Sequence, residues 1–166
     1  MLFSFTRTFL LIIFLMPYWL MKSEPEEMNI DDALRAQVIP WFGVRNYQAR
    51  NFMRDAMRVG DGVLFYHSSC AEPGIAGIAE VASTPYPDAT QFDSTGKYFD
   101  AKATLETPRW ILVDIKAVSK TRLLSLSEMR NDDSLSEMLV LKKGSRLSIT
   151  PVSPDQWNAV MRLLGK

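Results

Sequence analysis

The chain has little of the side-chain chemistry on which disulfide, metal and nucleotide-cofactor sites depend. Its 166 residues include one cysteine, Cys70, and one histidine, His67. A single cysteine excludes an intramolecular disulfide and favours a reducing, cytoplasmic environment. One cysteine and one histidine are too few for the four-ligand zinc sites built from Cys and His, so we expect no bound metal. Neither G-x-G-x-x-G nor a Walker-type phosphate loop occurs, so we also expect no cofactor.

An excess of charge of one sign is also missing. The 19 Lys and Arg side chains balance 19 Asp and Glu side chains. Each phosphate contact needs a basic side chain, so this balance argues against a protein that coats nucleic acid by bulk electrostatics. It is compatible with a local basic face. The 47% of apolar and 23% of charged residues are typical of one globular domain of this length.

The N-terminal residues 1–15 are mostly apolar and carry one charged side chain. The apolar stretch Phe9–Met21 is shorter than the roughly 20 residues that a membrane-spanning helix needs, and Pro17 interrupts it. No small-x-small cleavage site follows. We therefore predict that residues 1–15 are a misassigned extension, that translation starts at Met16, and that residues 16–166 form one domain without stable membrane association. A hydrophobic leader or anchor and an additional structured element are the alternatives.

Short strands and helices follow one another without a regular βαβ rhythm. Apolar or β-branched runs bounded by turn residues predict strands over residues 18–21, 63–67, 75–81, 110–115 and 146–149. Cap residues and helical spacing predict helices after Asn29, over residues 47–57, near Ser125 and after Ser153. Residues 92–106 are expected to form a long loop. The fold class predicted is a mixed α/β (α+β) domain with a mostly antiparallel sheet or small open barrel.

The segment Tyr66–Cys70 gathers the histidine, the cysteine and two serines at the end of a predicted strand. Alternation along a strand turns His67 away from Ser68, and no nucleophile-elbow glycines surround either serine. Three interpretations stay open. His67 contacts a ligand, it is structural, or it acts in catalysis with Ser69 or Cys70.

Recognition-type side chains are densest between residues 41 and 52. Asn and Gln offer the donors and acceptors that a base edge requires, and Trp and Tyr offer stacking planes, so this composition suits a nucleobase pocket. An equal alternative is a helix start, with Asn46 as its N-cap and an exposed arginine stripe beginning at Arg50. This stripe and residues 142–146 are the local basic features of the sequence.

Several segments together resemble the EVE domain family of the PUA-like superfamily. They are YWLMKSEP (18–25), WFGVRNYQARNF (41–52), FYHS (65–68), EPGIAG (72–77), YPDATQFD (86–93), PRWILVD (108–114) and RLSITP (146–151). The resemblance implies a PUA-like fold, a small curved sheet or pseudo-barrel with flanking helices. It also implies a non-catalytic domain that binds modified nucleobases, notably 5-modified cytosines in DNA, in a pocket between the barrel and residues 45–51. A role with RNA is also implied.

We therefore expect a nucleic-acid-binding module that takes a modified base of DNA or RNA into an aromatic- and amide-lined pocket. Residue type and the resemblance together give the ligand-binding candidates Trp19, Lys22, Ser23, Trp41, Arg45, Asn46, Tyr47, Gln48, Arg50, Asn51, His67, Ser68 and Trp110. The alternatives are an enzyme acting on modified bases or nucleosides through His67 with Ser69 or Cys70, and a small-molecule-binding domain. The kind of modification and the oligomeric state are left open.

Overall fold

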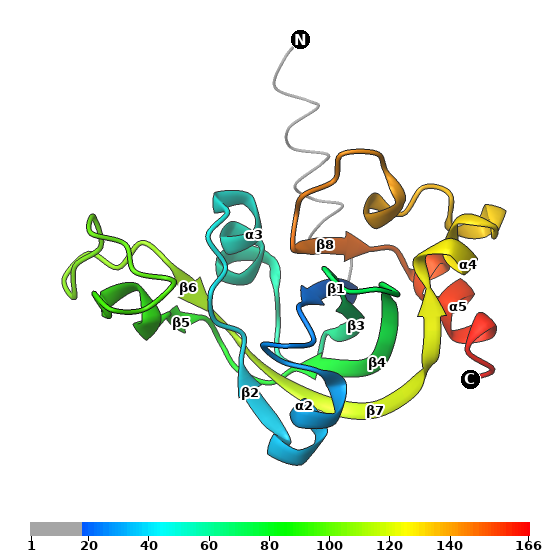
Figure 1. Ribbon diagram of the computed structural model, residues 1–166, viewed down its shortest axis with the longest axis horizontal. Helices are drawn as coiled ribbons and strands as arrows, with labels where there is room; N and C mark the ends of the chain where they lie inside the picture. The colour runs from blue at the N-terminus through cyan, green and yellow to red at the C-terminus, as the bar shows by residue number, and fades with distance from the viewer. Residues whose placement is uncertain (1–17) are drawn as a thin grey trace, which may run out of the picture.

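A curved, open sheet of six strands forms the frame of the protein (Figure 1). The computed structural model describes residues 18–166, and the predicted start at Met16 lies outside this range. In spatial order the strands are β2 (Val38–Pro40), β7 (Asp114–Ser125), β4 (Gly74–Val81), β3 (Gly62–His67), β1 (Tyr18–Ser23) and β8 (Ile149–Val152). Only β1 and β3 run parallel, and the other pairs are antiparallel. The predicted α+β class with a mostly antiparallel sheet is confirmed.

Helices start where local capping residues predict them. Asn29 caps α2 (Ile30–Ala36), and its side chain accepts the Asp32 N–H at 2.8 Å. Asn46 caps α3 (Tyr47–Asn51), which continues into the π-helical turn η1 (Phe52–Ala56). The remaining helices are α4 (Leu126–Arg130), α5 (Pro154–Leu163) and the 3-10 turns η2 (Ala89–Phe92), η3 (Asp133–Leu135) and η4 (Leu139–Leu141). The capping box predicted at Ser153 is present at the start of α5.

Two hydrophobic cores lie on the two faces of the sheet. Because side chains alternate along a strand, Trp19 and Met21 enter one core and Leu20 enters the other. The first core packs the sheet against α2, α3 and η1, and the second packs it against α4, the two turns after it and α5. Figure 1 shows α4 and α5 at one end of the molecule, away from α2 and α3.

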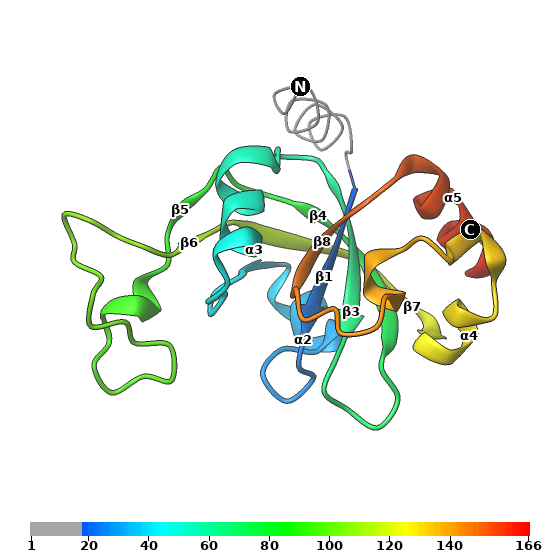
Figure 2. The same cartoon turned by 90° about the horizontal axis from the view of Figure 1, so that it is seen from above.

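The opposite end is formed by a small second sheet and a long loop (Figure 2). Strand β5 (Tyr86–Pro87) pairs with β6 (Ile111–Leu112), and the predicted loop over residues 92–106 connects the turn η2 to this pair. The fully buried Gln91 ties the loop together. Its amide donates to the Asp88 and Trp110 carbonyl oxygens, and its carbonyl oxygen accepts the Arg109 and Trp110 N–H groups.

Two strand predictions were wrong in position or extent, and the short strands β2 and β5 were not predicted. The strand predicted over residues 146–149 occupies Ile149–Val152, because Ile149, Thr150 and Val152 are the residues buried beside β1. Strand β7 runs to Ser125, well beyond the predicted end at residue 115. Its middle has exposed polar residues, which gave no apolar run in the sequence.

Candidate functional site

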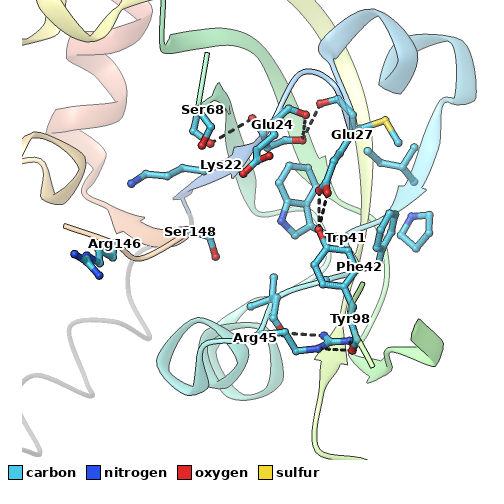
Figure 3. Close-up of a pocket in the computed structure, with 17 residues that line it drawn as sticks. Lys22, Glu24, Glu27, Trp41, Phe42, Arg45, Ser68, Tyr98, Arg146 and Ser148 are labelled. Atoms are coloured by element: carbon cyan, nitrogen blue, oxygen red, sulfur yellow. Dashed lines mark hydrogen bonds between the residues drawn. The ribbon is translucent and has the colours of Figure 1, made fainter. Parts of the chain in front are cut away.

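A cavity of about 440 Å³ opens where β1 and β3 end beside the segment that joins β2 to α3 (Figure 3). The parallel register sets Ser23 beside His67, so both strands end at the same edge. A volume of this size is within the range of small-molecule pockets, about 300–1,000 Å³. The lining residues are Lys22, Ser23, Glu24, Glu27, Met28, Ile39, Pro40, Trp41, Phe42, Gly43, Val44, Arg45, Ser68, Ser69, Tyr98, Arg146 and Ser148.

Trp41 forms a rigid wall of this cavity. Its ring packs edge-on against Phe65 with the centroids 5.4 Å apart, and only 6% of the residue is exposed. Among residues 18–166 the indole N–H has no hydrogen-bond partner, and because no buried side-chain polar atom there is unpaired, this nitrogen is accessible from the cavity. Figure 3 shows its nitrogen edge turned toward the side of the cavity where Lys22 and Ser148 lie. A fixed and unpaired donor therefore faces the cavity.

Tyr98 closes the opposite side of the cavity and reaches it because residue 43 is glycine. Gly43 has φ +82, and a Cβ atom on it would lie 2.7 Å from the Tyr98 ring. Any larger residue at this position would displace the ring and adopt a strained backbone. The loop that carries Tyr98 is therefore able to pack directly on the Trp41–Arg45 segment.

Arg45 and Asp88 hold that segment to the loop. The Asp88 carboxylate is 1% exposed and accepts hydrogen bonds from the Gly43 N–H and the Arg45 guanidinium, both at 2.9 Å. Arg45 also donates to the Tyr98 carbonyl oxygen at 2.7 Å and to the Thr90 hydroxyl at 2.9 Å. Arg45 lines the cavity, but its guanidinium is already engaged with the protein.

Glu27 joins the turn after β1 to the same loop. Its carboxylate accepts the Tyr98 hydroxyl at 2.7 Å and forms an ion pair with Lys97. These hydrogen bonds from Lys97 and Tyr98 hold the pKa of Glu27 below its ordinary value. The turn itself is closed by the Ser23 hydroxyl, which donates to the Met28 carbonyl oxygen at 2.7 Å.

Charged groups without partners line the cavity on the side away from Tyr98. Within residues 18–166, Lys22, Glu24 and Arg146 form no side-chain hydrogen bond and no ion pair. Lys22 is half-buried, and this burial lowers the pKa of its ammonium group. A polar ligand in the cavity would therefore meet a cation, a carboxylate and an indole donor that are not satisfied within the protein.

Five of the thirteen predicted ligand residues line this cavity: Lys22, Ser23, Trp41, Arg45 and Ser68. The other eight do not. Trp19 is completely buried in the first core, and its indole donates to Asp61 at 2.9 Å. The predicted recognition segment 41–52 is divided, because residues 41–45 face the cavity whereas residues 46–51 belong to α3 and lie outside it.

The α3 candidates form a separate cluster with Trp110. Tyr47 stacks on Trp110 with the ring centroids 5.0 Å apart, and the Arg50 guanidinium lies 4.7 Å from the Tyr47 ring. Arg50 also donates to Asn51 and to the Arg109 carbonyl oxygen. Gln48 is exposed, and Asn46 uses its side chain to accept the Ala49 N–H at 3.0 Å. For Asn46, the structure matches the helix-cap alternative.

His67 is a structural partner of α2. Its Nε2 accepts the Ile30 N–H at 3.2 Å, which occupies the lone pair that a general base at this atom would use. Burial lowers the pKa of the imidazole. Ser69 and Cys70 are exposed beyond the end of β3, and neither shares a hydrogen bond with His67.

Neither the predicted ligand residues nor the catalytic alternative included five polar residues of the cavity: Glu24, Glu27, Tyr98, Arg146 and Ser148. Glu24 and Arg146 lie within segments that carry the family resemblance, so that signal was available. Tyr98 lies in a long loop, and the sequence gives no distance between this loop and residue 43. In the part of the chain that the structure describes, no group of three His, Cys, Asp or Glu side chains is placed to hold a metal ion.

None of the helices in residues 18–166 is long and apolar enough to cross a membrane.

Comparisons with known proteins give consistent matches over nearly the whole described chain. The family described as EVE domain matches residues 17–163. Thymocyte nuclear protein 1 from Gallus gallus is 40% identical over 88% of this chain and 68% of its own length. A crystal structure of a Pseudomonas putida protein is 50% identical, covers 88% of this chain and 98% of its own, and has a TM-score of 0.85. The structure of human THYN1 protein in complex with 5-methylcytosine containing DNA is 39% identical, covers 90% and 98%, and has a TM-score of 0.82.

Proposed function

Because this chain belongs to the EVE domain family, we propose that it binds a modified nucleobase, a 5-modified cytosine in DNA, without catalysing a reaction. The human relative crystallised with 5-methylcytosine containing DNA supports this choice of ligand. We assign the base to the cavity beside Trp41. A base must leave its stack to enter such a cavity, at a cost of a few kcal/mol, and contact with aromatic side chains returns about 1–3 kcal/mol per base.

The observation that carries this proposal is the pair of unused polar groups at an aromatic wall. The Trp41 indole offers a donor, and the Glu24 carboxylate offers an acceptor without a partner within the described chain. Cytosine carries a ring nitrogen and a carbonyl oxygen that accept, and an exocyclic amine that donates. In our proposal Trp41 donates to an acceptor of the base, and Glu24 accepts from its amine.

The rest of the lining suits the two faces and the substituent of the base. Trp41 and Tyr98 supply aromatic surface, while Ile39, Pro40 and Phe42 supply apolar contacts for a group at carbon 5. Arg45 positions these walls through its bonds to Asp88 and Tyr98 rather than binding the ligand itself. In this proposal His67 supports α2, and neither Ser69 nor Cys70 has a base beside it.

The proposal is tested by tryptophan quenching with single- and double-stranded DNA and RNA oligomers, each carrying cytosine, 5-methylcytosine or 5-hydroxymethylcytosine. We expect tighter binding of modified DNA than of matched unmodified DNA at fixed salt. A stronger preference for modified RNA would change the assigned nucleic acid. Equal binding of all oligomers would overturn the proposal, as would conversion of a modified nucleoside detected by mass spectrometry.

The assignment of Glu24 has a matched control in the same turn. Glu24→Gln keeps the size of the side chain and replaces the carboxylate with an amide, so we expect roughly tenfold weaker binding of the modified oligomer, the cost of weakening one charge-assisted hydrogen bond. Glu26→Gln changes the charge equally at a residue that does not line the cavity. The same loss in both variants would point to net charge instead of a contact with the base.

A further inference from the structure

A second cavity of about 560 Å³ adjoins the first one. It lies between the segment that joins β3 to β4, the helix α4 and the segment that precedes β8. Lys22, Ser68 and Ser69 line both cavities. The two cavities are therefore adjacent, with these three side chains at their boundary.

The second cavity is basic, although the whole chain is neutral. Lys22, Arg130, Lys142 and Lys143 line it, and no Asp or Glu of the described residues does. Lys142 is paired with Glu137 at 3.0 Å. Lys22, Arg130 and Lys143 have no ion-pair partner in residues 18–166. Since charge-assisted hydrogen bonds to phosphate are strong, this cluster of cations without ion-pair partners in residues 18–166 is suited to an anion from outside the protein.

Tyr66 adds a donor to the same cavity. The residue is only 3% exposed, and its hydroxyl has no hydrogen-bond partner among residues 18–166. Because no buried side-chain nitrogen or oxygen of the described residues lacks a partner, this hydroxyl is the part of the side chain that opens to the cavity, where it is able to donate to a ligand. Burial raises the pKa of this phenol, so the group is a donor at neutral pH. Figure 3 shows the Lys22 side chain extending away from Trp41.

We propose that the second cavity binds a phosphate group of the nucleic-acid strand whose base occupies the first cavity. The inference rests on the proposed function, because it places the backbone next to the base. Lys22 stands at the junction and contacts the phosphate nearest the base. Arg130, Lys143 and the Tyr66 hydroxyl contact the same phosphate or the next one along the strand. Such contacts fix the position of the strand and carry no sequence preference.

The test measures the affinity for a single-stranded oligomer with one 5-methylcytosine, by fluorescence anisotropy at several salt concentrations, using the full chain. Each phosphate contact with single-stranded nucleic acid contributes about 0.7 to the slope of log affinity against log salt. For the double variant Arg130→Gln/Lys143→Gln we expect a slope smaller by about 0.7 to 1.4. The control Lys102→Gln/Lys166→Gln removes the same charge from residues that line neither cavity and should keep the wild-type slope.

Tyr66→Phe separates a contact in the cavity from a general effect of charge. It removes one neutral donor from the cavity wall, so we expect roughly tenfold weaker binding with the salt slope unchanged. Circular dichroism and urea denaturation verify that each variant folds. Unchanged affinity in Tyr66→Phe together with an unchanged slope in the double variant would overturn the inference.

A matched oligomer with unmodified cytosine makes the two possible failures distinguishable. A preference for 5-methylcytosine together with an unchanged salt slope in the double variant would overturn the inferred phosphate site and leave the proposed function intact. Equal binding of both oligomers, with the reduced slope, supports the phosphate site and overturns the proposed function. Absence of binding to either oligomer overturns both.

Discussion

At the scale of single residues, Asp88 organises the wall of the first cavity. Its carboxylate receives hydrogen bonds from the Gly43 N–H, the Arg45 guanidinium and the Thr90 N–H and hydroxyl. The carboxylate is buried, so these donors replace the water that it loses on folding. Together with the bonds from Arg45 to the Tyr98 carbonyl oxygen, they hold residues 43 and 45 to the loop that carries Tyr98.

The state of Asp88 predicts how stability depends on pH. Burial opposes ionisation, but the bonds from Thr90, Gly43 and Arg45 together outweigh it, so the pKa of Asp88 is lowered. Its ordinary pKa in an unfolded chain is about 3.9. Because the folded value is below the unfolded value, the contribution of Asp88 to stability is complete above that pH. It is lost as the pH falls through the folded value.

We therefore expect Asp88→Asn to lower the free energy of unfolding at pH 7 by about 3 kcal/mol, because Arg45 loses its charged partner in a partly buried site. The difference between wild type and variant should shrink below about pH 4. Urea denaturation between pH 7 and pH 3 measures both. The control Asp133→Asn changes an exposed carboxylate and should cost less than about 0.5 kcal/mol at pH 7. A constant difference across the pH range would show that Asp88 is not the titrating group.

At the scale of elements, the helix α3 depends on its cap. The helix is short and passes into the π-helical turn η1, so it has few internal hydrogen bonds of its own. The Asn46 side chain adds a hydrogen bond to the first turn by accepting the Ala49 N–H. The first core holds the other side of the helix through Ala49, Phe52 and Met53.

This arrangement gives opposite expectations for the two interpretations of Asn46. If Asn46 acts as a cap, Asn46→Ala should lower the free energy of unfolding by about 1 kcal/mol. Asn46→Ser should retain most of the wild-type stability, because serine also caps helices. Neither change should alter the affinity for a modified-cytosine oligomer, because Asn46 does not line the cavity. Thermal denaturation and tryptophan quenching on the same variants measure both effects. Weaker binding in both variants, with stability retained in Asn46→Ser, would restore the role in base contact.

Elements specified by nearby residues could be predicted from the sequence, and those specified by distant contacts could not. The caps at Asn29, Asn46 and Ser153 act within three residues and were recognised. The composition of residues 41–52 drew attention to Trp41 and Arg45, which line the cavity. It could not show that residues 41–45 line the cavity while α3 lies outside it, because the position of residue 45 is fixed by bonds to the distant residues Asp88 and Tyr98.

The whole molecule is built so that both cavities depend on one sheet. Strands β1 and β3 contribute alternate side chains to the two cores, and their ends carry Lys22, Ser23 and Ser68 into the cavities. The first cavity adjoins the first core, while Tyr66 of the second cavity belongs to the second core. Loss of either core would therefore remove the partner strands on which the other depends.

Cooperative unfolding is the consequence of this shared sheet, and it can be measured with 5-fluorotryptophan. Trp19 and Trp41 report on the first core, and Trp157, stacked on Tyr18 at 4.3 Å, reports on the second core. We expect their fluorine NMR signals to convert to unfolded positions at the same urea concentration. Val160→Ala removes buried methyl groups from the second core alone and should cost roughly 2 kcal/mol. In a single cooperative unit it shifts all these transitions equally. A shift confined to Trp157 would mean that α4 and α5 form a separately unfolding layer, and the two cavities would then lose their binding independently.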